Sequence, residues 1–462
     1  MEPKSARRSH RHATRRQRGS LASRVAAIGT LVSALLVSLP ADFVSAAPTT
    51  RLVSRAPDGT PADGESYDND LTPDARFVAF ASTASNFSSE DGPAVDVFVW
   101  DRRTGVLDLI SKTTEGAPAD GDSYLPSISA DGRYVAFLSE ADNLSSVDRD
   151  DVRDIFLRDR VSNTTTLVSK VRASRGGSPI LAADANSDNP SISDDGRYVA
   201  FDSEADNLSS RDRDGVEDVF LYDRETGGLQ LVSQSSSGAG GDSSSTASSI
   251  SGNGRFVTFS SYADNFSSLD KEAQSDVFIR DRVARTTRLV SRNSKGKPAN
   301  GPSGSPSVSS SGRFVAFVSD ANNLSSRDDD DYNNVFVRDM KKDKTRLVSR
   351  SSSEAPASHH SRMSKFYDSI SASGRYVVFE STADNLSSKD DDGHTNVFVR
   401  DVIDGRTRWI NRSATGDAAD DHGLYPAISG NGRYVAFWSL ATNLTPVDGG
   451  GVGNVFLRGP LF

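Results

Sequence analysis

A six-residue phrase, Gly-Arg-[Tyr/Phe]-Val-Ala-Phe or a close variant, occurs seven times in this sequence and constrains its fold more than any other feature. Successive copies are 57 to 64 residues apart. Self-similarity at a period of this length is typical of folds built from repeated supersecondary units. A length of 462 residues would allow roughly three ordinary domains, but the repeat predicts a single domain instead. The aromatic residues of the seven copies are Phe77, Tyr134, Tyr198, Phe256, Phe314, Tyr376 and Tyr434.

Each repeat unit reads as four short strands. An Ile-Ser-like segment precedes the phrase, the phrase itself is the second strand, an Asp/Asn-Val-Phe-like segment follows, and a Leu-Val-Ser-like segment closes the unit. In the second unit these segments are 127–129, 134–137, 154–157 and 167–169. Breaks fall at Gly, Asn, Asp and Pro, and no segment keeps an apolar period of 3.6 residues. Four-stranded antiparallel units repeated radially are the blades of a β-propeller.

The order of the strands predicts how the ring closes. The first Leu-Val-Ser segment, at 52–54, comes before the first phrase, and the seventh unit stops after its third strand at 454–458. An N-terminal strand near 50–55 is therefore expected to complete the last blade, which would pair both ends of the ring and remove an exposed sheet edge. We predict an all-β fold: a single seven-bladed β-propeller over residues 47–462, made of four-stranded antiparallel blades and closed by the N-terminal strand.

The repeated segment Ile-Ser-x-[Asp/Ser/Asn]-Gly-Arg-[Tyr/Phe]-Val-Ala-Phe resembles the repeat of the TolB-like, WD-repeat-like propellers of bacteria. The resemblance covers essentially all of residues 50–462. It implies a binding component of the periplasm or cell envelope.

The first 46 residues have a different composition from the repeats. They hold eight basic and two acidic residues, and an apolar run extends from Val25 to about Leu39 before the small residues Val44 to Ala47. This order is typical of a secretory signal peptide, with cleavage expected after Ala46. The apolar run is shorter than the ~20 residues that span a bilayer, although a retained N-terminal anchor is the alternative. We therefore predict a secreted or envelope-located monomer with no membrane span after cleavage.

Composition excludes several kinds of chemistry. The chain has no cysteine, so disulfides, thiolate nucleophiles and cysteine-ligated metals are absent. The net charge of −10 argues against nucleic acid as a partner. No Gly-x-Ser-x-Gly, phosphate-binding glycine loop or His-Glu-x-x-His motif occurs.

Loop lengths indicate which face of the propeller functions. The turns after the first and third strands are short and share one face, whereas the longer loops after the second and fourth strands share the other. We call the second the long-loop face. Because function resides on loops held by a rigid scaffold, the long-loop face is the predicted binding face.

The loops between the second and third strands carry acidic residues at alternate positions. The third unit reads Ser210-x-Asp212-x-Asp214-Gly215-x-x-Asp218. Oxygen ligands spaced in this way suit Ca²⁺, and the spacing resembles the calcium loops of integrin-type propeller repeats. Structural Ca²⁺ is one interpretation; Asx turns with solvated carboxylates are the other. The candidate metal ligands are Asp148, Asp150, Asp154, Asp212, Asp214, Asp218, Asp328, Asp330, Asn334, Asp390, Asp392 and Asn396.

Four histidines, His359, His360, His394 and His422, fall in the long loops around the sixth and seventh units. Imidazole and carboxylate groups together bind transition metals or transfer protons. They support an alternative function as a metal-assisted polysaccharide lyase or hydrolase with its site near blades 6 and 7. Exposed polar loop residues are the simpler interpretation.

Two further recurrent features are interpreted as structural. An Asn-[Leu/Phe]-[Ser/Thr] sequon occurs in every unit, beginning with Asn86 and Asn143, and its Asn is expected to satisfy a turn. The arginine of each phrase, such as Arg133, is expected to pair with the aspartate after the third strand, such as Asp159. The main functional prediction is a non-catalytic binding or scaffold propeller of the bacterial envelope, recognising a protein or glycan partner through the long-loop face and ordered by Ca²⁺.

Overall fold

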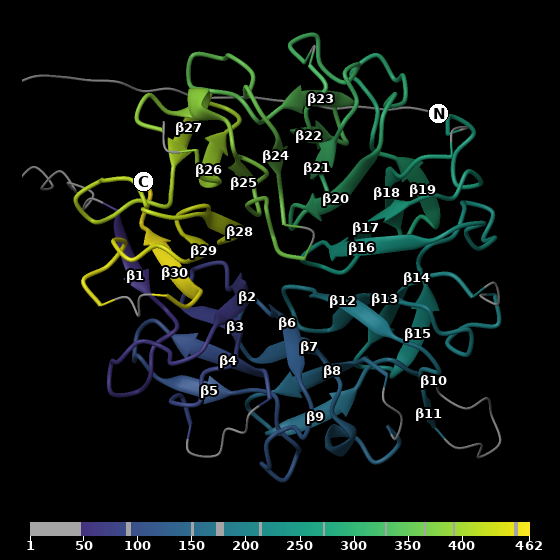
Figure 1. The fold of residues 1–462 in the computed structure, drawn as a ribbon. Helices are drawn as coiled ribbons and strands as arrows, with labels where there is room; N and C mark the ends of the chain where they lie inside the picture. Colours follow the sequence, from purple (N-terminus) through teal and green to yellow (C-terminus); the bar gives the residue numbers. More distant parts are fainter. Residues whose placement is uncertain are drawn as a thin grey trace, which may run out of the picture. The chain divides into compact units, whose positions relative to one another are not determined.

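The computed structural model describes residues 48–88, 94–148, 152–171, 180–211, 215–270, 273–328, 330–364, 366–390, 393–447 and 451–462. The predicted signal peptide, residues 1–46, lies outside the described residues. Seven four-stranded antiparallel sheets surround a common centre, with β2, β6, β12, β16, β20, β24 and β28 innermost (Figure 1). The predicted seven-bladed propeller is confirmed.

The first four blades follow chain order. Blade 1 contains β2 (Ser66–Leu71), β3 (Phe77–Ser82), β4 (Asp96–Asp101) and β5 (Leu107–Leu109). Blade 2 contains β6 (Ser123–Ile128), β7 (Tyr134–Ser139), β8 (Asp154–Asp159) and β9 (Thr164–Leu167). Blade 3 contains β12 (Ser187–Ile192), β13 (Tyr198–Ser203), β14 (Asp218–Asp223) and β15 (Gly228–Leu231). Blade 4 contains β16 (Ser245–Ile250), β17 (Phe256–Ser261), β18 (Asp276–Asp281) and β19 (Thr286–Leu289).

The last three blades complete the ring. Blade 5 contains β20 (Ser303–Val308), β21 (Phe314–Ser319), β22 (Asn334–Asp339) and β23 (Lys344–Leu347). Blade 6 contains β24 (Ser361–Arg362), β25 (Tyr376–Ser381), β26 (Asn396–Asp401) and β27 (Arg406–Trp409). Blade 7 contains β28 (Gly423–Ile428), β29 (Val435–Ser439), β30 (Asn454–Gly459) and the N-terminal β1 (Thr49–Leu52).

The described residues contain three other short elements of regular structure. A small hairpin of β10 (Lys170–Val171) and β11 (Leu181–Ala182) lies between blades 2 and 3, and η1 (Asp142–Leu144) and η2 (Asp384–Leu386) are single 3₁₀ turns. Within the part of the chain that the structure describes, no helix has the length and apolar character needed to cross a membrane.

The N-terminal strand closes the ring as predicted. β1 pairs antiparallel with β30, with Thr49 opposite Gly459 and Leu52 opposite Phe456. The buried guanidinium of Arg458 adds a side-chain connection, because its Nη1 donates to Thr50 Oγ1 at 2.6 Å and to the carbonyl oxygen of Arg412 at 2.6 Å. The first and last strands of the described residues are therefore held in one blade.

The hydrophobic core lies between adjacent blades. One apolar cluster joins Val219 and Leu221 of blade 3 to Ile250 and Phe259 of blade 4, and similar clusters occur around the ring. The second and third strands are buried along most of their length, as in β13 and β14. Since each blade covers the face of the next, these strands carry apolar residues at successive positions instead of alternating ones.

The recurrent phrase has a packing explanation. Gly132 adopts a φ of +72°, and a Cβ placed on it would lie 2.2 Å from the ring of Phe77 in the preceding blade. Arg133 pairs with Asp159 at 2.7 Å and also covers the ring of Tyr134. The glycine thus leaves room for a neighbouring aromatic ring, and the arginine pairs with the end of the third strand.

The predicted arginine–aspartate pairs are confirmed in six blades. Their N–O distances range from 2.6 to 2.9 Å. The predicted role of the sequon asparagines is confirmed as well, because in every unit the side-chain amide donates to a backbone carbonyl of the turn that enters the blade. The six arginine–aspartate ion pairs are Arg76–Asp101, Arg133–Asp159, Arg197–Asp223, Arg255–Asp281, Arg313–Asp339 and Arg375–Asp401.

Candidate binding site between blades 6 and 7

A pocket of about 370 Å³ opens between blades 6 and 7. Thr382 follows the end of β25, Thr395 precedes β26, and His360 precedes β24, so the pocket lies where the long loops join blade 6. Its inner wall comes from the innermost strands of the two blades. The lining includes His360, Arg362, Glu380, Thr382, Thr395 and Tyr425.

Glu380 lines this pocket and is held by the neighbouring blade. Its Oε2 accepts a hydrogen bond from the backbone N–H of Tyr425 at 2.9 Å. Burial raises the pKa of Glu380 above its usual value, while this hydrogen bond opposes the rise. A carboxyl group with a raised pKa in a cleft is a common feature of functional sites.

The backbone conformation of Tyr425 recurs at the equivalent residue of another blade. The innermost strands contain a β-bulge, and Tyr425 lies in the bulge of β28 with a φ of +52°. Ala247 is in the corresponding position of β16, with a φ of +55°, and its N–H donates to Asp202 Oδ2 at 2.7 Å. In both blades a carboxylate of the preceding blade therefore accepts the N–H of a left-handed residue. The bulge turns the Tyr425 side chain outward, and it is 43% exposed.

Two of the predicted histidines stabilise contacts between blades. His360 Nδ1 accepts the N–H of Asn333 at 3.0 Å, and His422 Nδ1 accepts the N–H of Thr395 at 2.8 Å. In blade 2 the same position is Asp122, which accepts the N–H of Val95 at 2.8 Å. In blade 3 it is Asn186, which accepts the N–H of Arg153 at 3.1 Å. These imidazoles therefore take the acceptor role of Asp122 and Asn186, and the Nδ1 that accepts the bond carries no hydrogen.

The four histidines make two separate sets of ring contacts: His359 and His360 each contact Tyr332, and His394 contacts His422. The ring of Tyr332 lies 5.4 Å from that of His359 and 5.0 Å from that of His360, measured between centroids. His394 and His422 are 5.0 Å apart. Among the residues that the structure describes, no group of three or more His, Asp or Glu side chains is arranged to hold a metal ion.

The candidate calcium ligands are only partly described. Asp150, Asp212, Asp214 and Asp392 lie outside the described residues, and calcium in the loops that contain them stays a prediction. The described ligands at the start of the third strand are buried and accept a hydrogen bond from the end of the fourth. The donor and acceptor residues, in that order, are Ser169–Asp154, Ser233–Asp218, Ser349–Asn334 and Asn411–Asn396.

Blades 5 and 6 have an asparagine as the first residue of the third strand, and its amide group contacts the aspartates of the preceding loop. Asn334 Nδ2 donates to Asp328 Oδ1 at 3.1 Å and to Asp330 Oδ1 at 3.3 Å, and Asn396 Nδ2 donates to Asp390 Oδ1 at 2.9 Å. Blade 2 has carboxylates in both places: Asp148 is 3% exposed and Asp154 is fully buried. The loops are therefore of two chemical kinds, carboxylate–amide and carboxylate–carboxylate.

Sequence reasoning missed Arg362, Glu380 and Tyr425. Glu380 takes a position that is alanine, leucine, serine or valine in most other units, so a charged residue within an apolar strand was the available signal. Its partner Tyr425 is in another blade, and sequence alone does not bring the two together.

The fold and this pocket define a seven-bladed β-propeller with a polar pocket on its long-loop face. The chain belongs to the family described as "Family of unknown function (DUF7453)", whose model matches residues 76–437. The comparison with curated proteins found no match.

Several solved structures are similar to this chain. An oligogalacturonate lyase from Vibrio parahaemolyticus has a TM-score of 0.52 and 13% identity, covering 89% of this chain and 97% of that chain. The propeller domain of the Trilobed protease from Pyrococcus furiosus has a TM-score of 0.50 and 10% identity, covering 87% and 97%. TolB from Acinetobacter baumannii has a TM-score of 0.39 and 14% identity, covering 76% and 64%. The lyase and protease-domain likenesses show the propeller fold, and the narrower TolB-like family membership stays a prediction.

Proposed function

We propose that this protein is a secreted, non-catalytic binding or scaffold propeller of the bacterial cell envelope, and that its long-loop face recognises a protein or glycan partner. The observation that carries the proposal is the pocket between blades 6 and 7, where an aromatic ring, a guanidinium group and a carboxylate converge. Concave sites that combine an apolar wall with a few placed polar groups are typical of ligand recognition.

The chemistry of the pocket favours a hydroxyl-rich ligand, so we commit to a glycan. Arg362 supplies donors and Glu380 acceptor capacity, while the hydroxyls of Thr382 and Thr395 do both. The exposed face of Tyr425 offers an apolar surface for a sugar ring. A protein partner would use the same face and is the other outcome of the test.

The experiment is a glycan-array screen of the whole protein, followed by calorimetric titration of each hit. Tyr425→Ala and Arg362→Ala are expected to weaken binding about tenfold each, which is the loss expected for one aromatic contact or one charged hydrogen bond. Tyr262→Ala is the matched control, because Tyr262 is a 53% exposed tyrosine in blade 4. Hits that respond equally to all three variants would place the binding elsewhere.

Calcium is a separate part of the proposal. We propose that Ca²⁺ orders those long loops that have carboxylates at both ends of the motif, as in Asp148 and Asp154 of blade 2. In blades 5 and 6 the amide N–H groups of Asn334 and Asn396 already face the aspartates. A cation is therefore favoured where two carboxylates replace the carboxylate–amide pair.

A metal-assisted lyase or hydrolase is the second candidate. The raised pKa of Glu380 favours it, because a carboxyl group and an imidazole near one cleft can transfer protons. His360 lines the pocket, and His422, whose ring lies 5.0 Å from that of His394, accepts the N–H of the pocket residue Thr395. Turnover of a polysaccharide that disappears in the His359→Ala, His394→Ala, His422→Ala triple variant would support this candidate over binding alone.

A further inference from the structure

Five blades bury an arginine at the fifth position of their third strand. Each is at most 7% exposed. In blade 4, Arg280 Nη1 donates to the carbonyl oxygen of Ser235 at 3.0 Å and to Thr287 Oγ1 at 2.9 Å. The guanidinium thus connects the turn that enters the blade with the outermost strand. The five residues are Arg158, Arg280, Arg338, Arg400 and Arg458.

In three of these blades the second amino group of the arginine also has an acceptor. Arg400 Nη2 donates to Glu354 Oε1 at 2.5 Å, and Arg338 Nη2 donates to Asp343 Oδ1 at 2.9 Å. In blade 2 an asparagine side chain provides the acceptor at 3.4 Å. Because a buried charge is costly unless it is paired, these acceptors offset the desolvation of the guanidinium.

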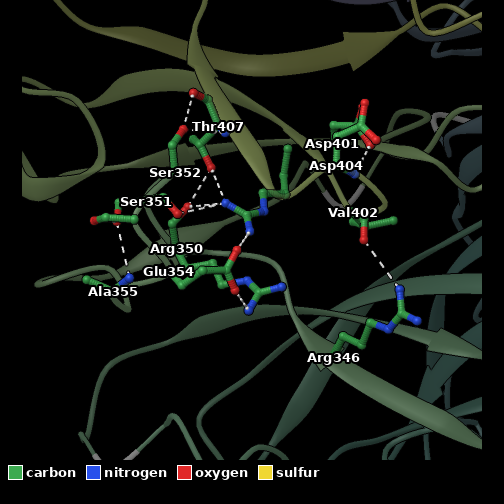
Figure 2. Close-up of polar contacts among 12 residues, drawn as sticks. Arg346, Arg350, Ser351, Ser352, Glu354, Ala355, Asp401, Val402, Asp404 and Thr407 are labelled. Carbon is green, nitrogen blue, oxygen red and sulfur yellow. Dashed lines mark hydrogen bonds and ion pairs between the residues drawn. The ribbon is translucent and has the colours of Figure 1, made fainter.

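Glu354 shows how a carboxylate fits beside the buried arginine of the third strand. It lies in the turn that enters blade 6, with a φ of +72°. Its carboxylate contacts Arg400, Arg350 and, at 3.2 Å, Arg327. Figure 2 shows Glu354 and Arg350 within these contacts. The rim between blades 5 and 6 is therefore a built carboxylate site whose occupant belongs to the chain itself.

The rim between blades 3 and 4 has the same framework, with glycine at the position of Glu354. Gly238 takes the place of Glu354 in the turn, and a Cβ on it would lie 3.7 Å from both Arg211 Nη1 and Gln234 Oε1. Arg211 corresponds to Arg327 by its place in the sequence Ser-Ser-Arg-Asp. Arg280 corresponds to Arg400.

A further arginine, Arg285, lines the same groove as Gly238. Arg285 corresponds to Gly405 of blade 6, where a Cβ would lie 2.9 Å from Glu354 Oε1. Arg285 is exposed at a φ of +56°. The groove of about 590 Å³ at this rim is lined by Arg211, Arg280 and Arg285, and its described lining contains no carboxylate.

Arg280 has unused donor capacity in this groove. Its side-chain hydrogen bonds to described residues all come from Nη1, whereas the Nη2 of Arg338 and of Arg400 donates to a carboxylate. The Nε atoms of all three arginines are buried with no partner among the described residues, so the difference between the blades lies at Nη2. Burial lowers the pKa of Arg280, and the nearby charge of Arg285 lowers it further. An anion would offset both effects.

We propose that the groove formed by Arg211, Arg280 and Arg285 binds the carboxylate group of an external ligand in the position that Glu354 occupies between blades 5 and 6. Guanidinium groups bind carboxylates with charge-assisted, often bidentate hydrogen bonds, which suits a planar anion here. The site is independent of the pocket between blades 6 and 7.

The test uses the whole protein and sodium acetate as the probe, with sodium chloride at equal ionic strength as the control. The arginine Nε–H signals are followed by ¹⁵N NMR, and the melting temperature is recorded in parallel. Acetate is expected to shift the Arg280 signal in a saturable way and to raise the melting temperature. Arg285→Ala is expected to weaken acetate binding about tenfold, the loss of one charged hydrogen bond.

Gly238→Glu sharpens the test, because it installs the carboxylate that blade 6 carries. This variant should melt higher without acetate and no longer respond to it. Gly59→Glu is the matched control: Gly59 lies in the corresponding turn with a φ of +91°, but blade 1 has Trp100 in place of the buried arginine. Equal shifts with chloride, or an acetate response that survives both Arg285→Ala and Gly238→Glu, would overturn the proposal.

Discussion

Tyr367 of blade 6 donates its hydroxyl to Oδ1 of Asp68 in blade 1 at 2.5 Å, which connects two blades that are not neighbours in the ring. The contact arises from four extra residues in blade 6: nine positions separate Ser361 from Ile370, against five between Ser123 and Ile128 in blade 2. Tyr367 is buried in the apolar cluster that blades 1 and 7 share.

Tyr367→Phe is expected to lower the free energy of unfolding by about 1–2 kcal/mol. The change removes one hydrogen bond and leaves a half-buried carboxylate without this donor. Urea unfolding followed by fluorescence measures the effect. Tyr262→Phe, at a 53% exposed tyrosine, is the control and should leave stability unchanged. Equal stability of the two variants would show that the contact does not stabilise the ring.

Gly132→Ala is expected to destabilise the protein by about 3 kcal/mol or more. A Cβ at Gly132 would lie 2.2 Å from the Phe77 ring, and the residue would also keep a φ of +72°. Gly59→Ala separates the two causes, because Gly59 has a φ of +91° and a Cβ placed on it would have no atom within 4 Å. It should cost only about 1 kcal/mol. The comparison requires thermal or urea unfolding of both variants.

Thr50→Val tests the closure of the ring. Thr50 Oγ1 accepts from Arg458 Nη1 and donates to the carbonyl oxygen of Arg412 at 2.7 Å. Loss of this hydroxyl should lower the free energy of unfolding by about 2 kcal/mol, because the buried guanidinium of Arg458 loses an acceptor. Hydrogen exchange should accelerate selectively in β1 and β30. Thr165→Val removes the corresponding hydroxyl in blade 2, where covalent continuity holds the blade, and should leave exchange at the closure unchanged.

Asp202 predicts a pH dependence of stability. Burial raises its pKa to about 6, although hydrogen bonds from Asn189, Thr246 and Ala247 oppose the rise. The folded protein therefore holds this proton more tightly than the unfolded chain, whose aspartates titrate near ~3.9. The contribution of Asp202 to the free energy of unfolding is present in full below pH ~4 and is lost as the pH rises through the folded pKa of about 6, a total of about 3 kcal/mol. Asp202→Asn should flatten this part of the curve of unfolding free energy against pH.

Asp154→Asn tests the proposed calcium loops. The substitution reproduces the arrangement of blade 5, where Asn334 Oδ1 still accepts from Ser349 at 2.6 Å and Nδ2 donates to Asp328. The wild-type protein is expected to melt higher with Ca²⁺ than with a chelator, and the variant should lose the blade 2 share of that difference while remaining folded. Wild-type melting that is identical under both conditions would contradict structural calcium.

The repeat determined the fold because each structural role recurs at a fixed place along the chain. Seven copies of the phrase marked the second strands, and the position of 52–54 before the first copy predicted that β1 pairs with β30. The pair Arg133–Asp159 was predictable for the same reason: both residues belong to one blade, and its antiparallel register places them together.

The candidate sites depended on contacts between blades, which the repeat does not encode. Glu380 meets the N–H of Tyr425, and Tyr367 reaches Asp68, only because the ring brings these segments together. The 62-residue spacing before Tyr376 revealed the extra residues but not where they pack. Likewise, the proposed carboxylate site at Gly238 and Arg280 became visible only by comparison with Glu354 and Arg400, the equivalent residues of blade 6, which contact each other. The sequence by itself determined the number, order and closure of the blades, because these follow from local hydrophobic and turn patterns. The tertiary structure decided the pocket and the arginine groove, because both are formed by side chains distant in the chain.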